Sequence, residues 1–530
     1  MKNLMFCIAL LLGGLTAAAQ VTVTGTVTSA DDGETLIGAT VRVVENPTNG
    51  VVTDLDGNYS ISLQPGQTVE YSYMGFDQQR KKFNATQRYD VKLASTKTLD
   101  EVVVIGYGTM KKSDVTGSVS SIAAENLQKT PSASLANALQ GQAAGVTVNS
   151  LTGRPGASAE VRIRGVGTVN GASPIYVVDG VITDDISFLS PSDIASTEIL
   201  KDASATAIYG SRGANGVVIV TTKTGKKGER AHITFDMYAG WQSRWRKLDV
   251  MNAKDFADTY VNINANARAR KVYEEQGFNA WLNTFMGVGA SPYFPTVYNA
   301  ETNPTGFDYS AVDTDWQDVV FRDATIQNYH LSIDGGTDKF TYSMSGSWFG
   351  QEGTIIGSNF SRLTARLNTT YQATKWLKIG ENLSFTSSQS RNAYESGDNV
   401  ESAGANIISA AFAMAPWDPT RYPEGSVNRN GKDLSGGISA GSNFKNVTNP
   451  LSMVEYSNPK VNNERWLGNV FAEINPWSTL TFKSTFSFDY KLTRDRSFME
   501  AYEVSAYDKR EHNFLSSSMA VSYTHLRAHE

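Results

Sequence analysis

Eight stretches between Ala231 and Tyr523 alternate apolar and polar residues over roughly ten positions each. In one of them, positions 340, 342, 344, 346 and 348 are Phe, Tyr, Met, Gly and Trp, and the residues between are Thr and Ser. Successive side chains of a strand point to opposite faces, so each stretch predicts a strand with one apolar and one polar face. A series of such strands indicates a transmembrane β-barrel with a polar lumen.

The connections between these stretches favour a membrane wall over a soluble sandwich. Short connections alternate strictly with long ones: 336–338, 373–375 and 475–478 are short, and 244–324, 350–360, 391–463 and 491–513 are long. Outer-membrane barrels have short periplasmic turns and longer outer loops. Aromatic residues at strand ends are typical of a girdle at the membrane surface: Trp241, Trp348, Trp376, Trp466, Trp477 and Tyr490. Glu381 falls on an apolar face, so we expect a bulge or a protein-covered position there.

Composition neither reveals nor excludes such a wall. Hydrophobic residues make up 40% of the 530 positions, which is an ordinary value for a soluble protein. A barrel is compatible with this value, because its strands are apolar only at alternate positions. Apart from the barrel pattern, no stretch approaches the length of a transmembrane helix. The net charge of −6 argues against nucleic acid as a partner, since nucleic-acid-binding surfaces are basic.

The first residues have the features of a secretory signal peptide, residues 1–19. Lys2 supplies a positive start, 4–12 is apolar, and Ala17 and Ala19 form a small-x-small cleavage site. The apolar run is too short for a transmembrane anchor. Cys7 lies inside the run and not at its end, which argues against a lipoprotein.

The mature chain contains no cysteine, which excludes disulfides, thiolate metal sites and a thiol nucleophile. It also lacks the Gly-x-Ser-x-Gly, His-Glu-x-x-His and P-loop motifs. His525 and His529 have helical metal-pair spacing without the intervening Glu, and His232, His330 and His512 are isolated, so we interpret the last three as wall or surface residues. We therefore expect no catalytic residues, no metal site and no cofactor.

Residues 20–95 predict a small β-sandwich. Short strand-like runs are separated by Asp-Gly and Pro-Gly turns at 32–33, 56–57 and 65–66. The stretch from Asp54 to Gly57 lacks most ligands of a calcium loop, so a turn is the better interpretation. Glycine, acidic and aromatic positions from Gly25 to Phe76 resemble the carboxypeptidase regulatory-like domain, which is a non-catalytic sandwich in its family.

A linker at 96–111 has an apolar centre formed by Asp100, Glu101, Val102, Val103, Val104 and Ile105. Four β-branched residues in a row favour an extended backbone. Two interpretations remain open: a further sandwich strand, or a detachable strand that pairs with the sheet edge of a partner.

Residues 112–228 predict a compact α/β domain. Residues 134–140 have a helical pattern; 160–164, 175–178 and 216–222 have strand patterns; and 193–199 and 203–209 have patterns of short helical turns. Asp179-Gly180 follows an apolar run and predicts a turn at the end of a strand. Within the long connection that starts at 244, the sequence predicts one helix from Asn252 to about Gln276.

Several motifs in the same order resemble the SusC/RagA-type TonB-dependent outer-membrane transporters. They are 99–108, 115–119, 137–146, 161–165, 174–181, 199–222, 315–321 and 335–353, with the most specific run being 199–222. The resemblance extends from the N-terminal domain to about Tyr523.

The resemblance implies a mainly β protein: an N-terminal β-sandwich, an α/β plug at 112–228, and at 229–523 the first part of a barrel of about 22 strands. It implies that Asp100 to Ile105 are the TonB box, a strand offered to TonB, which ExbB and ExbD couple to the proton motive force. The matching plug positions are Arg164, Gly165, Asp179, Gly180, Asp202, Tyr209, Gly210, Arg212 and Gly216.

The resemblance also implies partners and a location. The family works in the outer membrane of Gram-negative bacteria, surrounded by lipid, with a SusD-like surface lipoprotein as a lid. Its cargo is typically oligosaccharide or peptide. Eight strands cannot enclose a plug of this size, so we expect a truncated reading frame. Residues 524–530 abandon the alternation, and we expect an atypical tail there.

Four functional hypotheses follow. The first is an energised import receptor, and the second is a passive or adhesive surface protein. Residues 100–105 favour the first, because an adhesin needs no periplasmic strand donor. An enzyme ranks last, since no zinc-ligand set accompanies the carboxypeptidase-like domain. A signalling receptor would need an extra α/β domain before the plug, and 21–95 has an all-β pattern.

Overall fold

A computed structural model of the chain describes residues 20–30, 33–94, 102–105, 108–111, 119–128, 132, 134–150, 152–167, 171–264, 266–285, 288, 293–392, 406–425, 433–435, 449–477, 479–504 and 509–529. The expected signal peptide, residues 1–19, lies outside the described residues. The chain divides into two compact units. The first contains the N-terminal β domain, and the second contains the α/β domain and the long strands.

The first unit is a β-sandwich, as predicted. One sheet has the order β4-β1-β7 with β8 also paired to β1, and the other has the order β3-β2-β5-β6. The strands are β1 (Val21–Ser29), β2 (Thr40–Val43), β3 (Asn46–Val52), β4 (Asn58–Leu63), β5 (Thr68–Ser72), β6 (Gln79–Lys82), β7 (Gln87–Arg88) and β8 (Val91–Leu93). Val23 and Ile61 from one sheet share a buried core with Val41 and Tyr71 from the other. Alternate residues of each strand therefore fill the space between the sheets.

The linker forms a short hairpin. Strand β9 (Val102–Ile105) pairs with β10 (Gly108–Lys111) in a two-stranded sheet. This pairing separates β9 from both sheets of the sandwich, so β9 is not the further sandwich strand that the sequence left open.

The α/β domain, which we call the plug, is built on a five-stranded sheet of order β11-β16-β17-β14-β15. Its strands are β11 (Val119–Ala123), β14 (Ile175–Val178), β15 (Val181–Thr183), β16 (Ile194–Leu200) and β17 (Val217–Thr222). A separate hairpin joins β12 (Val146–Asn149) to β13 (Glu160–Ile163). The helical segments are α2 (Ala124–Gln128), α3 (Leu135–Ala138), η2 (Pro191–Asp193), α4 (Ala203–Thr206) and η3 (Ala207–Asn215).

The predicted helical turn at 193–199 is wrong, because Ile194–Leu200 is strand β16. Its apolar residues supply two separate clusters: Ile194 and Ile199 pack in one, and Leu200 in the other. A strand buried on both faces shows no alternation of apolar and polar residues. For this reason the sequence of this segment did not predict a strand.

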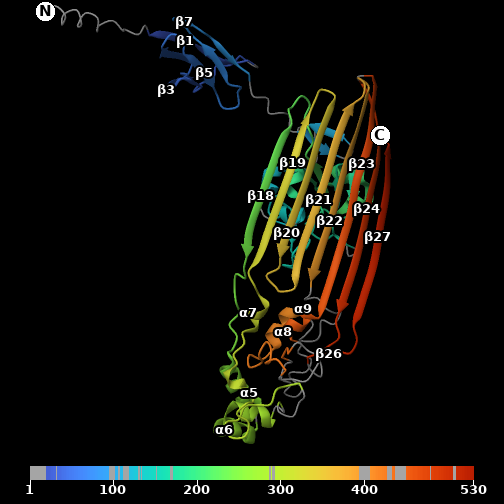
Figure 1. Ribbon diagram of the computed structural model, residues 1–530. Coiled ribbons are helices and arrows are strands. Elements are labelled where there is room, and N and C mark those ends of the chain that lie inside the picture. The colour runs from blue at the N-terminus through green and yellow to red at the C-terminus, as the bar shows by residue number, and fades with distance from the viewer. Residues whose placement is uncertain are drawn as a thin grey trace, which may run out of the picture. The chain divides into compact units, whose positions relative to one another are not determined.

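The long strands form one antiparallel sheet of eight, which we call the wall (Figure 1). Its order follows the chain: β18 (His232–Gln242), β19 (Ala324–Gly336), β20 (Phe340–Glu352), β21 (Ser358–Gln372), β22 (Leu377–Asn392), β23 (Ser457–Trp477), β24 (Leu480–Met499) and β27 (Phe514–His529). The eight predicted strands are confirmed. Strand β27 runs on to His529, which pairs with Ser484, so 524–529 continues the strand and does not leave it as expected.

The two faces of the wall differ in polarity. Large apolar residues on one face are exposed, among them Ile233, Phe235, Leu331, Met344, Leu363, Phe482 and Phe486. Polar and charged residues on the other face are buried, among them His330, Ser347, Arg362, Arg366, Arg465 and Asn469. Exposed apolar and buried polar side chains are the reverse of a soluble sheet, as a barrel wall in lipid requires.

Glu381 lies on the apolar face, as the sequence indicated. Of the two alternatives expected at this position, a bulge or a protein-covered residue, the bulge is wrong, because the register of β22 with both neighbours is continuous through Glu381. The carboxylate is instead partly buried, and it accepts a hydrogen bond from the Thr369 hydroxyl at 3.3 Å.

The long connections gather helices beyond one end of the wall strands, and the short turns lie at the other end (Figure 1). The helices are α5 (Ala253–Asn264), α6 (Ala267–Phe285), η5 (Tyr309–Ala311), α7 (Trp316–Val320), α8 (Ile407–Ala413) and α9 (Pro450–Glu455), with short strands β25 (Tyr502–Glu503) and β26 (Lys509–Arg510). The single helix predicted at 252–276 is therefore two helices. Within the described part of the chain, no helix is both long and apolar enough to cross a membrane.

Candidate functional site

Of the segment predicted to bind TonB, Val102, Val103, Val104 and Ile105 form strand β9, while Asp100 and Glu101 lie outside the described residues. Extended backbone is the conformation that strand addition to a partner sheet needs. In the described structure the strand already has a partner in β10.

Arg164 and Gly165 form a tight turn directly after β13. Arg164 has a φ of 59° and Gly165 a φ of 86°, and the left-handed region is costly for a residue with a Cβ. Two interactions hold Arg164 there: its N–H donates to the Gly145 carbonyl at 2.9 Å, and its guanidinium pairs with Asp202. The ion pair joins the end of β13 to the start of α4.

Tyr209, Gly210, Arg212 and Gly216 lie in the irregular segment between α4 and β17. Tyr209 is buried, and Gly210 takes a φ of 60°. Gly216 has a φ of 93°, and a Cβ added to it would lie 2.7 Å from Ile163 Cδ1. Arg212 lies 3.7 Å from Asp184 in an exposed ion pair. The glycines therefore set the backbone path, and only Arg212 presents a charge to solvent.

Asp179 and Gly180 are the two-residue turn between β14 and β15, since Val178 pairs with Val181. Their φ angles of 48° and 86° fit a type I′ hairpin turn, so the predicted turn is confirmed. The Asp179 carboxylate accepts hydrogen bonds from the Thr222 N–H at 3.0 Å and from its hydroxyl at 2.5 Å. The turn is thus fastened to the end of β17.

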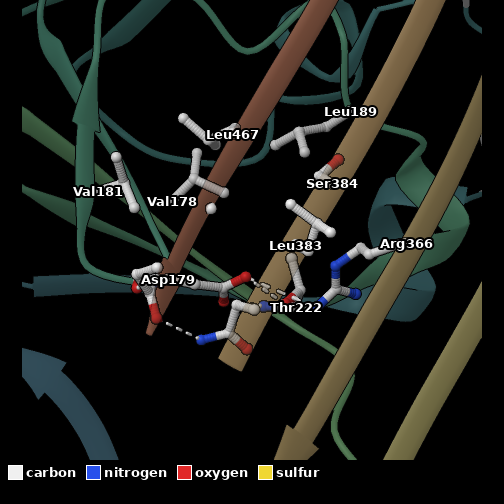
Figure 2. Close-up of a pocket in the computed structure, with 12 residues that line it drawn as sticks. Val178, Asp179, Val181, Leu189, Thr222, Arg366, Leu383, Ser384 and Leu467 are labelled. Carbon is white, nitrogen blue, oxygen red and sulfur yellow. Dashed lines mark hydrogen bonds and ion pairs between the residues drawn. The ribbon is translucent and has the colours of Figure 1, made fainter. Parts of the chain in front are cut away.

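The same turn faces the wall. Arg366 on β21 donates to the Thr222 hydroxyl and to the Asp193 carbonyl at 3.3 Å, and lies 3.6 Å from Asp179 Oδ2. Asn469 on β23 donates to the Asp179 carbonyl at 2.8 Å. Figure 2 shows Asp179, Thr222 and Arg366 converging beneath the apolar residues Val178, Leu383 and Leu467. The cavity between them measures about 10 Å³, roughly the space that one water molecule needs.

Asp193, at the end of η2, is nearly fully buried and meets His330 of β19, whose Nε2 lies 3.0 Å from Asp193 Oδ1. Burial alone would raise the pKa of Asp193, but the hydrogen bond with His330 and the positive charge of Arg366 hold it below its ordinary value. The His330 ring also lies 3.6 Å from Asp236 on β18. This residue, interpreted from sequence as wall or surface, therefore belongs to the plug contact.

Arg465 on β23 makes the third polar contact. Its Nε lies 2.9 Å from Asp489 Oδ1 on β24, and a terminal nitrogen donates to the Thr183 hydroxyl of the plug. The guanidinium carbon also lies 4.2 Å from the Phe188 ring centroid, at cation–π distance.

Residues 183–193 of the plug, which we call the anchor segment, collect most of these contacts. Arg362 donates to the Ser187 carbonyl at 2.5 Å, and Thr386 donates to the Phe188 carbonyl at 3.3 Å. Side chains of β19, β21, β22 and β23 therefore converge on one stretch of eleven residues.

Sequence reasoning missed the wall residues of this interface: His330, Arg362, Arg366, Thr386, Arg465, Asp489 and Asn469. The available signal was charge on the polar face, since Arg362 and Arg366 alternate with Leu363, Ala365 and Leu367. Such a charge predicts that the side chain faces the lumen, but the sequence does not predict which atom of the plug the side chain contacts.

Comparison with known proteins agrees with this architecture. Residues 111–217 match the family model of the TonB-dependent receptor plug domain, and residues 23–104 match that of the CarboxypepD_reg-like domain. TonB-dependent receptor P3 of Formosa agariphila is 34% identical over 506 residues, covering 94% of this chain and 45% of the relative. TonB-dependent receptor SusC of Bacteroides thetaiotaomicron is 33% identical over 474 residues, covering 86% of this chain and 42% of the relative.

Among solved structures, the RagAB peptide importer in its open-open state is similar, with a TM-score of 0.65 and 28% identity. The match covers 80% of this chain and 46% of that one. The chain therefore spans a little under half the length of these relatives.

The two family-model matches and the relatives show that the chain is homologous to TonB-dependent receptors. Within that class, the chain belongs with the SusC-like receptors, whose sequences it matches from its first domain into the wall.

Proposed function

We propose that this chain serves active import of a nutrient across the outer membrane of a Gram-negative bacterium, with the plug as the gate. The observation that carries the proposal is the polar interface of His330, Arg366 and Arg465 with the plug. Polar contacts satisfied by many separate hydrogen bonds can be exchanged for water when the plug moves, whereas a continuous apolar core would resist opening.

In this proposal, the energy that moves the plug comes from a partner and not from the outer membrane itself. We propose that residues 100–105 pair with TonB, and that ExbB and ExbD supply force through TonB. Pairing of backbone groups gives many hydrogen bonds without side-chain chemistry, which suits a segment of β-branched residues. The homology to TonB-dependent receptors supports this role.

We further propose a SusD-like surface lipoprotein as the partner that covers the long connections, and oligosaccharide or peptide as cargo. The structural neighbour is described as a peptide importer, and this supports peptides as the first cargo to test. The helices of the long connections, all beyond one end of the wall (Figure 1), provide the surface on which a lid would rest.

Substitution of Val103 by proline tests the energy coupling. Proline removes a backbone donor from β9 and cannot continue a strand ladder, so uptake of labelled cargo by cells should fall to the level of a strain without TonB. The measurement is cargo accumulation over time, with the amount of receptor in the outer membrane determined in parallel.

Val103→Ala is the matched control, because alanine keeps the backbone N–H, and this variant should retain most of the uptake. Normal uptake by Val103→Pro would contradict the assignment of the TonB box. Cargo binding at the surface without TonB-dependent accumulation in the wild type would instead favour the passive or adhesive alternative.

A further inference from the structure

Three turns meet at one end of the sandwich sheet β3-β2-β5. Thr40 at the start of β2 pairs with Val52 at the end of β3 and with Ser72 at the end of β5. The turns that precede β2, follow β3 and follow β5 therefore lie next to one another, although they are far apart in the sequence.

Each of these turns exposes a large apolar side chain. Ile37 is 49% exposed, Leu55 80% and Met74 93%, and Val52 beside them is 67% exposed. We call these four residues the apolar tip. Single exposed apolar residues are ordinary, but several on adjacent turns are typical of an interaction site. The core does not need them, because their neighbours Leu36 and Thr53 are the buried residues of the same turns.

The first two turns are held rigidly. The Thr53 hydroxyl accepts from the Ala39 N–H at 2.8 Å and donates to the Leu36 carbonyl at 2.5 Å, which joins the turn of Ile37 to the end of β3. The Asp54 carboxylate accepts from the N–H groups of Asp56 and Asn58. Ile37 and Leu55 are therefore presented at fixed positions.

The third turn is held by an aromatic contact. The rings of Tyr73 and Phe76 lie 5.6 Å apart, and the Phe76 N–H donates to the Tyr73 carbonyl at 3.1 Å. Gly75 supplies the φ of 83° that closes the turn. Because hydrogen bonds hold the backbone of these turns before any contact forms, binding would cost little backbone entropy.

The negative charges on these turns indicate what kind of partner the apolar tip can bind. Glu34, Asp54, Asp56 and Asp77 lie on or beside the turns, and all four are exposed. An acidic rim is repelled by the anionic surface of a bilayer. It is also repelled by an identical tip on a second copy, since a two-fold contact brings the same residues together.

We propose that the apolar tip is a docking site for another protein whose surface is apolar with a rim of Lys or Arg. Apolar contacts would supply the affinity, and the acidic rim would supply orientation and association rate. This surface is separate from the segment proposed for TonB, and its use does not depend on transport.

A photo-crosslinking amino acid placed at Leu55 or at Met74 of the full chain, in cells, tests the docking site. The control position is Gln64, an exposed residue that follows β4 at the opposite end of the sandwich. We expect one protein adduct from both tip positions and none from Gln64. No adduct at the tip, equal adducts at Gln64, or an adduct with a second copy of the chain would overturn the proposal.

An adduct alone does not establish the chemistry, so the charge of the rim is tested by Asp56→Lys. In the turn described above Asp56 uses only its backbone N–H, so the substitution leaves the turn intact. We expect the adduct yield from position 55 to fall about tenfold, because a basic rim is then repelled. An unchanged yield would overturn the proposal, and so would wild-type binding to phosphatidylglycerol vesicles that increases with Asp56→Lys, which would indicate a membrane contact.

Discussion

Arg366 illustrates how a single residue couples wall and plug. It is buried on the polar face of β21 and pairs with Asp179, while Asp179 also accepts both hydrogen bonds from Thr222. A buried charge is tolerated only when it has partners, and loss of one partner leaves the other uncompensated. The two charges therefore depend on each other across the interface.

Arg366→Met should destabilise the plug by about 3 kcal/mol, because it leaves the partly buried Asp179 carboxylate without its cation. The measurement is unfolding of the plug in a double-mutant cycle with Asp179→Asn, in which the two losses should be less than additive. Arg391→Met is the control, since Arg391 donates to the carbonyls of Val454 in α9 and Ser457 at the start of β23, both outside the plug. Strict additivity would contradict the coupling.

At the scale of elements, the anchor segment is a loop fixed by the strands around it. Its backbone carbonyls at Ser187, Phe188 and Asp193 accept from wall side chains, which satisfies groups that a buried loop would otherwise leave unpaired. Elsewhere in the plug, β13 approaches the start of β17 so closely that a Cβ on Gly216 would lie 2.7 Å from Ile163 Cδ1.

Gly216→Ala tests that packing. The new Cβ would meet Ile163 and require a left-handed backbone, so we expect a loss of about 1–3 kcal/mol in plug stability. The measurement is hydrogen exchange of the amides in β13 and β17. Gly167→Ala is the control, because no atom lies within 4 Å of a Cβ at that position; an equal effect at both glycines would refute the steric explanation.

The strands of the wall were predictable from sequence, whereas β16 and the interface were not. The wall strands alternate apolar and polar residues, because one face of a barrel strand meets lipid and the other meets the lumen. In β16, residues 197–200 are buried on both faces, so the alternation is lost there. His330 and Asp193 are 137 positions apart, and no local signal joins them. The Asp179-Gly180 turn was predicted because the chemistry of a hairpin turn is local.

At the scale of the whole wall, polarity is reversed relative to a soluble sheet, and this makes the cost of a charge depend on its face and depth. Leu331→Arg, in the middle of β19 on the exposed apolar face, should impair assembly by about 2–4 kcal/mol. The measurement is the heat-sensitive electrophoretic mobility of the receptor in outer-membrane fractions.

Phe340→Arg, at the end of β20 beside a short turn, is the matched substitution near the membrane surface, and it should cost about 1 kcal/mol or less. Equal assembly defects at Leu331 and Phe340 would show that the exposed apolar face does not cross a hydrocarbon layer.

The ion pair between Arg465 and Asp489 has a consequence for the plug movement that we propose. Both residues belong to the wall, so this arginine keeps its counter-ion after Thr183 and Phe188 withdraw. Arg366 differs, because its carboxylate partner leaves with the departing domain. After that movement, the charge of Arg465 would still be neutralised by Asp489. Arg366 would be left without a counter-ion, and its charge would attract the Asp179 hairpin back to the wall.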